Sequence, residues 1–201
     1  MNDASLQAIP AQLHWANAPL DWQSNAVDAL SITAGAKTDL FIDPQNGQAI
    51  DSAPRLLFES EDRYFLFSAK VSVAFRTAFD AGVLLLYADT HRWAKLCFEY
   101  TPDHRPMIVS VVTQTVSDDC NSQPIAGDAV YLRIARLDRA FAFHFSEDGQ
   151  YWHLARLFRM ESMEPLKVGF SAQSPTGTSC SASFTEITFE KRRLTALRNG
   201  E

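Results

Sequence analysis

Residues 93–119 read WAKLCFEYTPDHRPMIVSVVTQTVSDD, and this stretch predicts two long β-strands joined by a Thr-Pro-Asp turn. Successive side chains of a strand point to opposite faces, so one face carries Trp93, Lys95, Cys97 and Glu99. The three residues between them are apolar and are expected to face the core. A tryptophan, an ammonium group and a carboxylate on the other face indicate a surface that presents these groups to a ligand.

The rest of the chain repeats this pattern, because short apolar or alternating segments bounded by turn residues recur and helical periodicity is almost absent. The sequence therefore predicts an all-β fold in which two antiparallel sheets pack as a sandwich. Residues 191–198 alone favour a short C-terminal helix, and the lack of a linker or repeat predicts one domain over residues 1–201. The expected strands are residues 29–34, 39–42, 55–59, 64–75, 82–88, 93–100, 107–116, 129–137, 140–145, 151–158, 167–172 and 181–190.

The composition is typical of a folded protein that binds neither polyanions nor membranes. Apolar residues make up 46% of the chain, and 14 phenylalanines supply ample material for a core. A formal net charge of -6 and a pI near 5.3 argue against a nucleic-acid or anionic-membrane partner, since such partners require a basic surface. The longest apolar run, AGVLLLYA, is too short to span a bilayer, and the N-terminal residues lack the features of a secretory signal.

The cysteine and histidine content favours a reduced protein without a metal. Cys97, Cys120 and Cys180 are an odd number without metal-ligand spacing, so we expect free thiols and a cytoplasmic location. Only His144 and His153 are expected to lie close together, whereas a catalytic zinc site takes three protein ligands. The sequence therefore predicts neither a metal nor a cofactor.

A hairpin over residues 141–158 is predicted in more detail than any other element. The Asp-Gly dipeptide at residues 148–149 favours the positive φ values of a two-residue turn, and such a turn fixes the register of the two strands. In that register His144 lies opposite His153 on the non-core face, with β carbons ~4.5 to 5.5 Å apart. A three-residue loop would shift the register and separate the two imidazoles.

Five strings of sequence carry a resemblance to a known family: WAKLCFE (93–99), SVVT (110–113), SD (117–118), LRIAR (132–136) and SEDGQYW (146–152). In this order and spacing, the chain resembles the family catalogued as domain of unknown function 1349. That family is related to a yeast regulation-of-enolase protein and lies within the concanavalin A-like lectin/glucanase superfamily. The resemblance spans roughly residues 13–190. Two positions depart from the family pattern: Cys97, where a glycine is common, and Asp119, where an aromatic residue is common.

The resemblance implies a curved two-sheet jelly roll whose concave face receives carbohydrate in many members of the superfamily. Members of the family itself have no settled activity. Hydrolases of the superfamily carry acidic residues spaced as Glu-x-Asp-x-Glu on one strand, and no segment of this chain has that spacing. Glu59 and Glu61 come nearest, but they fall at a predicted turn and are typical of a solvated charge cluster. The chain also lacks nucleophile-elbow, phosphate-loop, dinucleotide and Cys-x-x-Cys motifs.

The candidate ligand groove combines the strand at 93–99 with residues of strands expected beside it. Its members are Trp93, Lys95, Glu99, Thr113, Arg133, His144 and His153. Trp93 is expected to stack on a sugar ring, since a large aromatic residue on a polar face needs a cover. In the alternative interpretation, Lys95, Glu99 and Arg133 form an exposed ion-pair network, and a loop or second subunit covers Trp93.

Three functional hypotheses follow from these residues. The first is a protein that binds a carbohydrate or small polar metabolite on the concave face without hydrolysing it, so we lean against an enzyme. The second is an enzyme acting on a sugar or small metabolite, with Glu99 as general acid or base tuned by Lys95 or His144. The third is an interaction module that regulates a metabolic enzyme. Exposed sheet edges also make a homodimer plausible.

Overall fold

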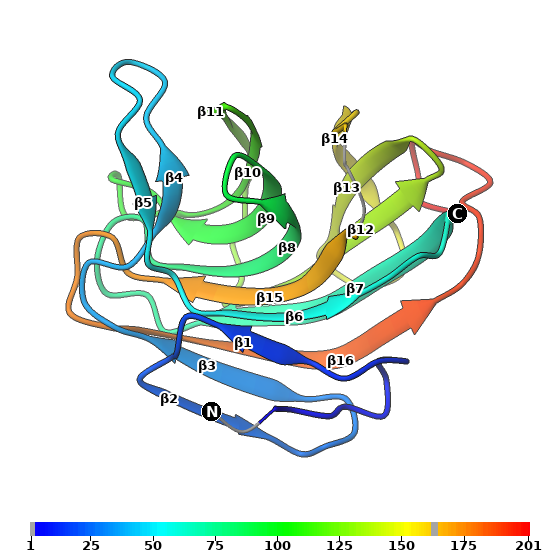
Figure 1. The fold of residues 1–201 in the computed structure, drawn as a ribbon, viewed down its shortest axis with the longest axis horizontal. Helices are drawn as coiled ribbons and strands as arrows, with labels where there is room; N and C mark the ends of the chain where they lie inside the picture. The colour runs from blue at the N-terminus through cyan, green and yellow to red at the C-terminus, as the bar shows by residue number, and fades with distance from the viewer. Residues whose placement is uncertain (1–2, 162–164) are drawn as a thin grey trace.

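The computed structural model describes residues 3–161 and 165–201, which form strands and connecting turns without any helix (Figure 1). Within these ranges no helix is therefore long and apolar enough to cross a bilayer. Two seven-stranded sheets and one two-stranded hairpin hold the strands, and neighbouring strands pair antiparallel. This arrangement confirms the predicted all-β jelly-roll sandwich.

Sheet I carries most of the candidate site and has the strand order β1-β6-β15-β8-β9-β10-β11. The stretch that was expected to form two strands contributes to three adjacent ones, in which Trp93 of β9 lies opposite Thr113 of β10. The strands of sheet I are β1 (His14–Ala16), β6 (Arg55–Glu59), β15 (Lys167–Gln173), β8 (Ala81–Asp89), β9 (Arg92–Tyr100), β10 (Pro106–Gln114) and β11 (Val116–Pro124).

Sheet II packs against sheet I and has the strand order β14-β13-β12-β7-β16-β3-β2. Its strands alternate between large apolar side chains that face sheet I and mixed side chains on the outer face. They are β14 (His153–Phe158), β13 (Ala140–Ser146), β12 (Ala129–Leu137), β7 (Tyr64–Val73), β16 (Cys180–Glu190), β3 (Leu30–Ala34) and β2 (Asp21–Ser24).

All twelve predicted strands are present, and four strands were not predicted: β1, β2, β5 (Ala49–Asp51) and β11. The sequence of β11, VSDDCNSQP, is polar almost throughout because this strand forms one edge of sheet I and most of its residues are exposed. It therefore lacks the apolar alternation by which a half-buried strand is recognised.

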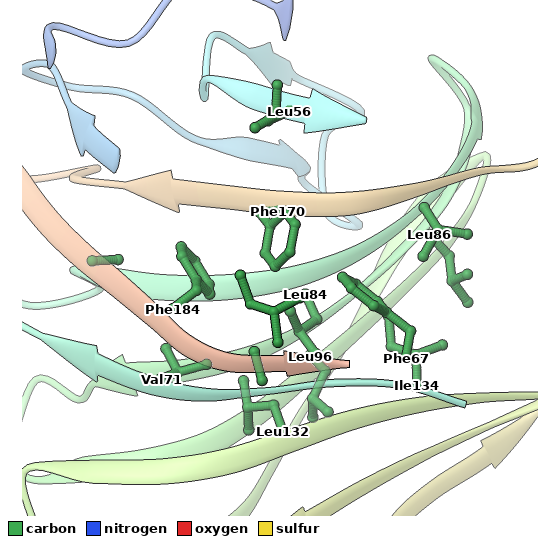
Figure 2. Packing of buried hydrophobic residues seen from close by; sticks show 14 of the residues in the cluster. Leu56, Phe67, Val71, Leu84, Leu86, Leu96, Leu132, Ile134, Phe170 and Phe184 are labelled. Atoms are coloured by element: carbon green, nitrogen blue, oxygen red, sulfur yellow. The ribbon is translucent and has the colours of Figure 1, made fainter. Parts of the chain in front are cut away.

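The main core lies between the two sheets and contains the apolar face predicted for β9. Ala94, Leu96 and Phe98 are fully buried there, whereas their neighbours on the same strand point to the opposite face. Figure 2 shows Leu96 of sheet I in the same cluster as Phe67 and Ile134 of sheet II. Burying such a side chain contributes about 1.5 to 3 kcal/mol.

A smaller apolar cluster lies on the outer face of sheet I, against the hairpin of β4 (Leu40–Ile42) and β5. Leu40 and Ile42 are buried in this cluster together with Trp93 of β9. The backbone N–H of Ile42 also donates a hydrogen bond of 2.9 Å to the Ser117 hydroxyl of β11. The hairpin, which projects at the upper left in Figure 1, is thereby fixed to the outer face of the sheet.

The C-terminal tail packs on the outer face of sheet II, and the helix predicted at residues 191–198 was wrong. Leu194 and Leu197 of the tail pack with apolar residues of that face. Two tail carbonyls, including that of Leu197, form hydrogen bonds with His144 and Arg133. These contacts with the sheet stabilise an irregular segment in place of a helix.

Gly169 allows β15 to pair closely with β6. A β carbon at this position would overlap the backbone carbonyl of Leu56, which belongs to the strand and cannot rotate away. The glycine is therefore required by the approach of two backbones rather than by a turn.

Candidate functional site

A pocket of about 370 Å³ opens on the outer face of sheet I, beside the β4–β5 hairpin. This volume lies near the lower end of the ~300 to 1,000 Å³ range of small-molecule sites. Lys95 and Glu99 reach the pocket because they have the same parity on β9, opposite to the core. The complete lining is Asp39, Phe41, Phe79, Lys95, Glu99, Val111, Asp119, Gln173, Pro175 and Thr176.

Trp93 shares the outer face with Lys95 and Glu99, as predicted, but it is fully buried. It lies in the apolar cluster with Leu40 and Ile42 of the β4–β5 hairpin, so the expectation that it stacks on a sugar ring was wrong. The alternative, in which a loop covers the indole, describes the structure correctly. No residue of the described chain accepts a hydrogen bond from the indole N–H, so Trp93 contributes through packing.

Thr113 is also fully buried and helps to fix the β4–β5 hairpin rather than lining the pocket. Its hydroxyl lies 2.9 Å from the hydroxyl of Ser117, which accepts the hydrogen bond from the backbone of Ile42. Thr113 thus supports one wall of the pocket from behind.

Lys95 lies at the floor of the pocket and is fully committed to protein partners. Its ammonium group donates to the Asp39 carboxylate at 3.1 Å and to the Gln173 side-chain oxygen at 2.9 Å. Burial alone would lower the pKa of Lys95, but the charges of Asp39, Cys97 and Glu99 raise it above its ordinary value. Lys95 is therefore a fixed cation, since only 3% of its surface is exposed.

Glu99 is the most perturbed carboxyl group of the pocket. Only 8% of its surface is exposed. Burial raises its pKa from 4.5 to about 8, against the opposing effect of Lys95 and with added repulsion from Asp119 and Asp39. Glu99 consequently holds a proton near neutral pH. In this protonated state its carboxyl group both donates and accepts hydrogen bonds.

Asp119 enters the pocket from the edge strand β11 and remains exposed. Partial desolvation raises its pKa above the ordinary value, while Lys95 acts in the opposite direction. Lys95 and Asp119 lie opposite Val111 of β10 from either side, so their backbones are about 10 Å apart. Glu99 lies four residues further along β9, which adds about 13 Å along the strand direction.

Phe79 forms an exposed aromatic wall and has an unusual backbone. Its side chain is 38% exposed, and its φ of 71° lies in the left-handed region that a bulky residue rarely adopts. Two hydrogen bonds hold this conformation: the Phe79 N–H donates to the Tyr100 carbonyl at 2.6 Å, and its carbonyl accepts from Gln173 at 3.1 Å. Gln173 also binds Lys95, so the floor of the pocket and its aromatic wall are connected.

Arg133 and His144 were expected in the same groove, and this expectation was wrong because they lie on the outer face of sheet II. Arg133 lies 3.5 Å from the centre of the Trp152 ring and donates a hydrogen bond of 2.8 Å to the Gly200 carbonyl. The His144 Nε2 lies 2.8 Å from the carbonyl oxygen of Leu197. Burial lowers the pKa of both side chains, that of Arg133 to about 10. Neither side chain is part of an ion-pair network with Glu99.

The predicted pairing of His144 with His153 was also wrong. Gly149 has the positive φ of 75° that was expected. However, the loop after β13 continues as far as His153, where β14 begins, and the register between β13 and β14 contains a bulge. His144 therefore lies opposite Leu154, while His153 lies opposite Phe145 and stacks on its ring at 5.0 Å. His153 is exposed on sheet II, away from the pocket.

Sequence reasoning missed most of the residues that complete the pocket. Phe79 lies in a loop without a motif, and Gln173 is the last residue of β15, one position beyond the strand predicted at residues 167–172. Asp119 drew notice only as a departure from the family pattern. The sole signal for Asp39 was its place at the start of a predicted strand, so only the fold brings these residues to Lys95 and Glu99.

The lining of the pocket combines carboxyl, amide, ammonium and aromatic groups. In the described part of the chain, no group of three or more His, Cys, Asp or Glu side chains has an arrangement that could hold a metal. Cys97 lies beneath the pocket, and burial raises the pKa of its thiol well above the usual value, so it remains protonated. The pocket instead offers carboxyl and amide groups at its floor and aromatic rings at its walls.

Comparison with known proteins places the chain in a recognised group. A family model described as "Protein of unknown function (DUF1349)" matches residues 15–192. No curated protein sequence matches the chain.

Solved structures with the same fold include a functionally unknown protein from Saccharomyces cerevisiae. It is 23% identical, has a TM-score of 0.80, and aligns over 88% of this chain and 95% of its own. A xylan beta-1,4-xylosidase from Bacillus halodurans C-125 is 14% identical, with a TM-score of 0.65 over 87% of this chain and 38% of the enzyme. An alginate lyase from Klebsiella pneumoniae is 12% identical, with a TM-score of 0.54 over 83% of this chain and 82% of its own. At these identities the likeness concerns the fold alone.

Proposed function

The chain belongs to the family of proteins of unknown function DUF1349, and we propose that its pocket on sheet I binds a small polyhydroxylated molecule, such as a sugar, without hydrolysing it. One observation carries this proposal: buried polar groups at the floor face the same cavity as aromatic walls. Sugars present both kinds of surface, since their hydroxyl groups form hydrogen bonds and their ring faces pack on aromatic side chains.

The division of roles follows from the contacts. The protonated Glu99 carboxyl group donates hydrogen bonds to the hydroxyl groups of the ligand and accepts them, and the Asp119 carboxylate accepts them. Both are available, because within the described residues no other side chain forms a hydrogen bond with either of them and the neighbouring charges act from a longer distance. Phe79 packs on the ring of the ligand from an exposed position. Lys95 keeps Asp39 and Gln173 in place and so preorganises the floor.

The spacing of Glu99 and Asp119 argues against a retaining glycosidase. A retaining glycosidase needs its two carboxyl groups ~5 to 5.5 Å apart. Glu99 and Asp119 are separated by two strand spacings and four residues, a backbone distance of about 16 Å. Their side chains are too short to close that gap to the spacing of a retaining enzyme.

A second candidate function rests on the protonated state of Glu99. A carboxyl group with a pKa of about 8 in a pocket is suited to act as a general acid near neutral pH. In this alternative the protein turns over a sugar or small metabolite, and Glu99→Gln abolishes turnover while it leaves binding intact.

A thermal-shift screen of monosaccharides, disaccharides and polyols tests the proposal. A ligand at ten times its Kd stabilises the protein by about 1.4 kcal/mol, which raises the Tm by roughly 3 to 6 °C for a chain of this size. Phe79→Ala is expected to lose this shift. Tyr151→Ala removes another exposed aromatic ring outside the pocket and is expected to retain it. The proposal fails if no sugar or polyol gives a shift, or if both variants respond alike.

A further inference from the structure

We infer that the preferred ligand of this pocket carries an ammonium group, which lies against the Glu99 carboxyl while the rest of the molecule extends towards Asp119. This inference rests on the proposed function and narrows the class of ligand. It follows from the charges of the pocket, the lack of a partner for Glu99, and the aromatic walls.

The pocket contains more carboxyl groups than cations. Asp39, Glu99 and Asp119 line it, and among the described residues Lys95 is the one cationic side chain of the lining. The ammonium group of Lys95 is held by Asp39 at 3.1 Å and by Gln173 at 2.9 Å. The charge of Lys95 is thus neutralised by a partner within the protein. The remaining carboxyl groups make the pocket favour a ligand of positive charge over one of negative charge.

Glu99 lacks the partner that a buried carboxyl group requires. Its surface is 92% buried, and within the described residues its side chain forms neither a hydrogen bond nor an ion pair. A buried ionisable group without a partner is costly to the fold, so its presence at the wall of a cavity indicates a ligand that completes it. A hydroxyl group would supply one hydrogen bond, whereas an ammonium group supplies a hydrogen bond and the missing charge.

The walls point to an organic cation rather than a metal ion. Phe41 and Phe79 both line the pocket, and an aromatic face attracts an ammonium group within about 6 Å of its centre. No metal-holding cluster exists among the described residues. A volume of about 370 Å³ leaves room for a small ring that bears the amine.

Binding of an ammonium group is coupled to loss of a proton. Glu99 faces Lys95 and Cys97 of its own strand, Asp119 of β11, and Asp39 before β4. Burial and the two carboxylates raise the pKa of Glu99 to about 8, and Cys97 stays a neutral thiol. When the cation binds, the carboxylic acid ionises to a carboxylate, its proton passes to buffer, and the ammonium group keeps all of its protons.

Calorimetry with three matched sugars tests this inference. Glucose, its amine analogue with an aminomethyl group in place of the hydroxymethyl group, and glucuronate differ at one carbon only. At pH 7 we expect the amine analogue to bind about 10-fold more tightly than glucose, and glucuronate to bind more weakly than glucose. Titration in buffers of different ionisation enthalpy is expected to show release of nearly one proton for the amine analogue and none for glucose.

Variants assign the effect to Glu99. Glu99→Gln is expected to remove both the preference for the amine and the release of a proton, while it still binds glucose. Glu59→Gln removes a carboxyl group at the exposed end of β6, outside the pocket, and is expected to keep both. Asp118→Asn is a second control, on β11, and is also expected to keep the preference for the amine and the release of a proton. Asp118 pairs with Arg156 at 2.9 Å and lies outside the pocket lining.

The outcomes separate this inference from the proposed function. Equal affinity for glucose and its amine analogue, or tightest binding of glucuronate, overturns the inference but leaves sugar binding intact. Binding of cyclohexylmethylammonium as tightly as the sugar amine supports the ammonium site and contradicts the need for hydroxyl groups. Failure of all four probes to bind overturns the inference, and the proposed function is overturned only if the wider thermal-shift screen also finds no ligand.

Discussion

Replacing Glu99 by glutamine is expected to stabilise the protein, and to do so more strongly as the pH rises. Glutamine has nearly the shape of the protonated acid but never has to ionise. The pKa of Glu99 is about 8 in the folded protein against 4.5 as the ordinary value. Since the folded-state pKa is the higher one, ionisation of Glu99 costs the wild type no stability below pH ~4.5 and costs it progressively more as the pH rises towards ~8.

The magnitude follows from this shift. Each pH unit between the two pKa values costs the wild type about 1.4 kcal/mol that the variant does not lose. The variant is therefore expected to exceed the wild type in free energy of unfolding by about 3 kcal/mol at pH 7, and by about 5 kcal/mol above pH 8. Near pH 4.5 the two proteins are expected to be about equally stable.

Urea denaturation followed by tryptophan fluorescence measures this difference at several pH values, because the chain contains four tryptophans. Glu59→Gln is the control and is expected to change stability by less than about 0.5 kcal/mol at every pH, since Glu59 is exposed. A difference between Glu99→Gln and wild type that stays constant from pH 5 to 8 would refute the reasoning.

Three further predictions concern other parts of the structure. Lys95→Met leaves the Asp39 carboxylate without its partner and is expected to cost about 3 to 5 kcal/mol at neutral pH, with partial recovery on adding Asp39→Asn. A double-mutant cycle by urea denaturation measures this coupling, and additive effects would count against it. Gly169→Ala places a β carbon on the Leu56 carbonyl and is expected to destabilise by about 2 kcal/mol or more, so an unchanged Tm argues against the close approach. Burial lowers the pKa of His144, so the contribution of His144 to stability is expected to decrease as the pH falls below ~6.5. His144→Gln is expected to weaken that pH dependence in Tm measurements, and equal slopes would speak against it.

The sequence predicted the fold and the facing of β9 because both depend on local alternation. Trp93, Lys95 and Glu99 emerge on one side of sheet I, as strand geometry requires. The alternation of side chains does not indicate which other segments of the chain pack on each face of a strand. The β4–β5 hairpin covers Trp93, and nothing in residues 93–99 indicates that cover.

The errors at Arg133 and His144 have the same origin. Both lie on strands whose polar parity was identified correctly, but a sandwich has two outer faces. The sequence pattern does not distinguish the outer face of sheet I from that of sheet II, since each alternates apolar and polar residues. A bulge near His144 then shifted the hairpin register, which turn residues alone do not reveal.

The pocket-lining residues from loops and edge strands had the weakest signals. Asp119 lies on β11, which pairs through its backbone and needs no apolar face. Phe79 occupies a strained turn that is held by Gln173 and Tyr100 from distant parts of the chain. These positions become visible only when long-range pairing is known.

The most direct test of a pocket built around an unpaired, protonated glutamate is the titration of the Glu99 carboxyl carbon by NMR. We predict that one glutamate titrates with a pKa of about 8, that its signal is missing in Glu99→Gln, and that its pKa falls when the amine analogue of glucose binds. If every glutamate carboxyl titrates near the ordinary value of 4.5, the charge state assigned to this pocket is wrong and the inferred preference for a cation loses its basis.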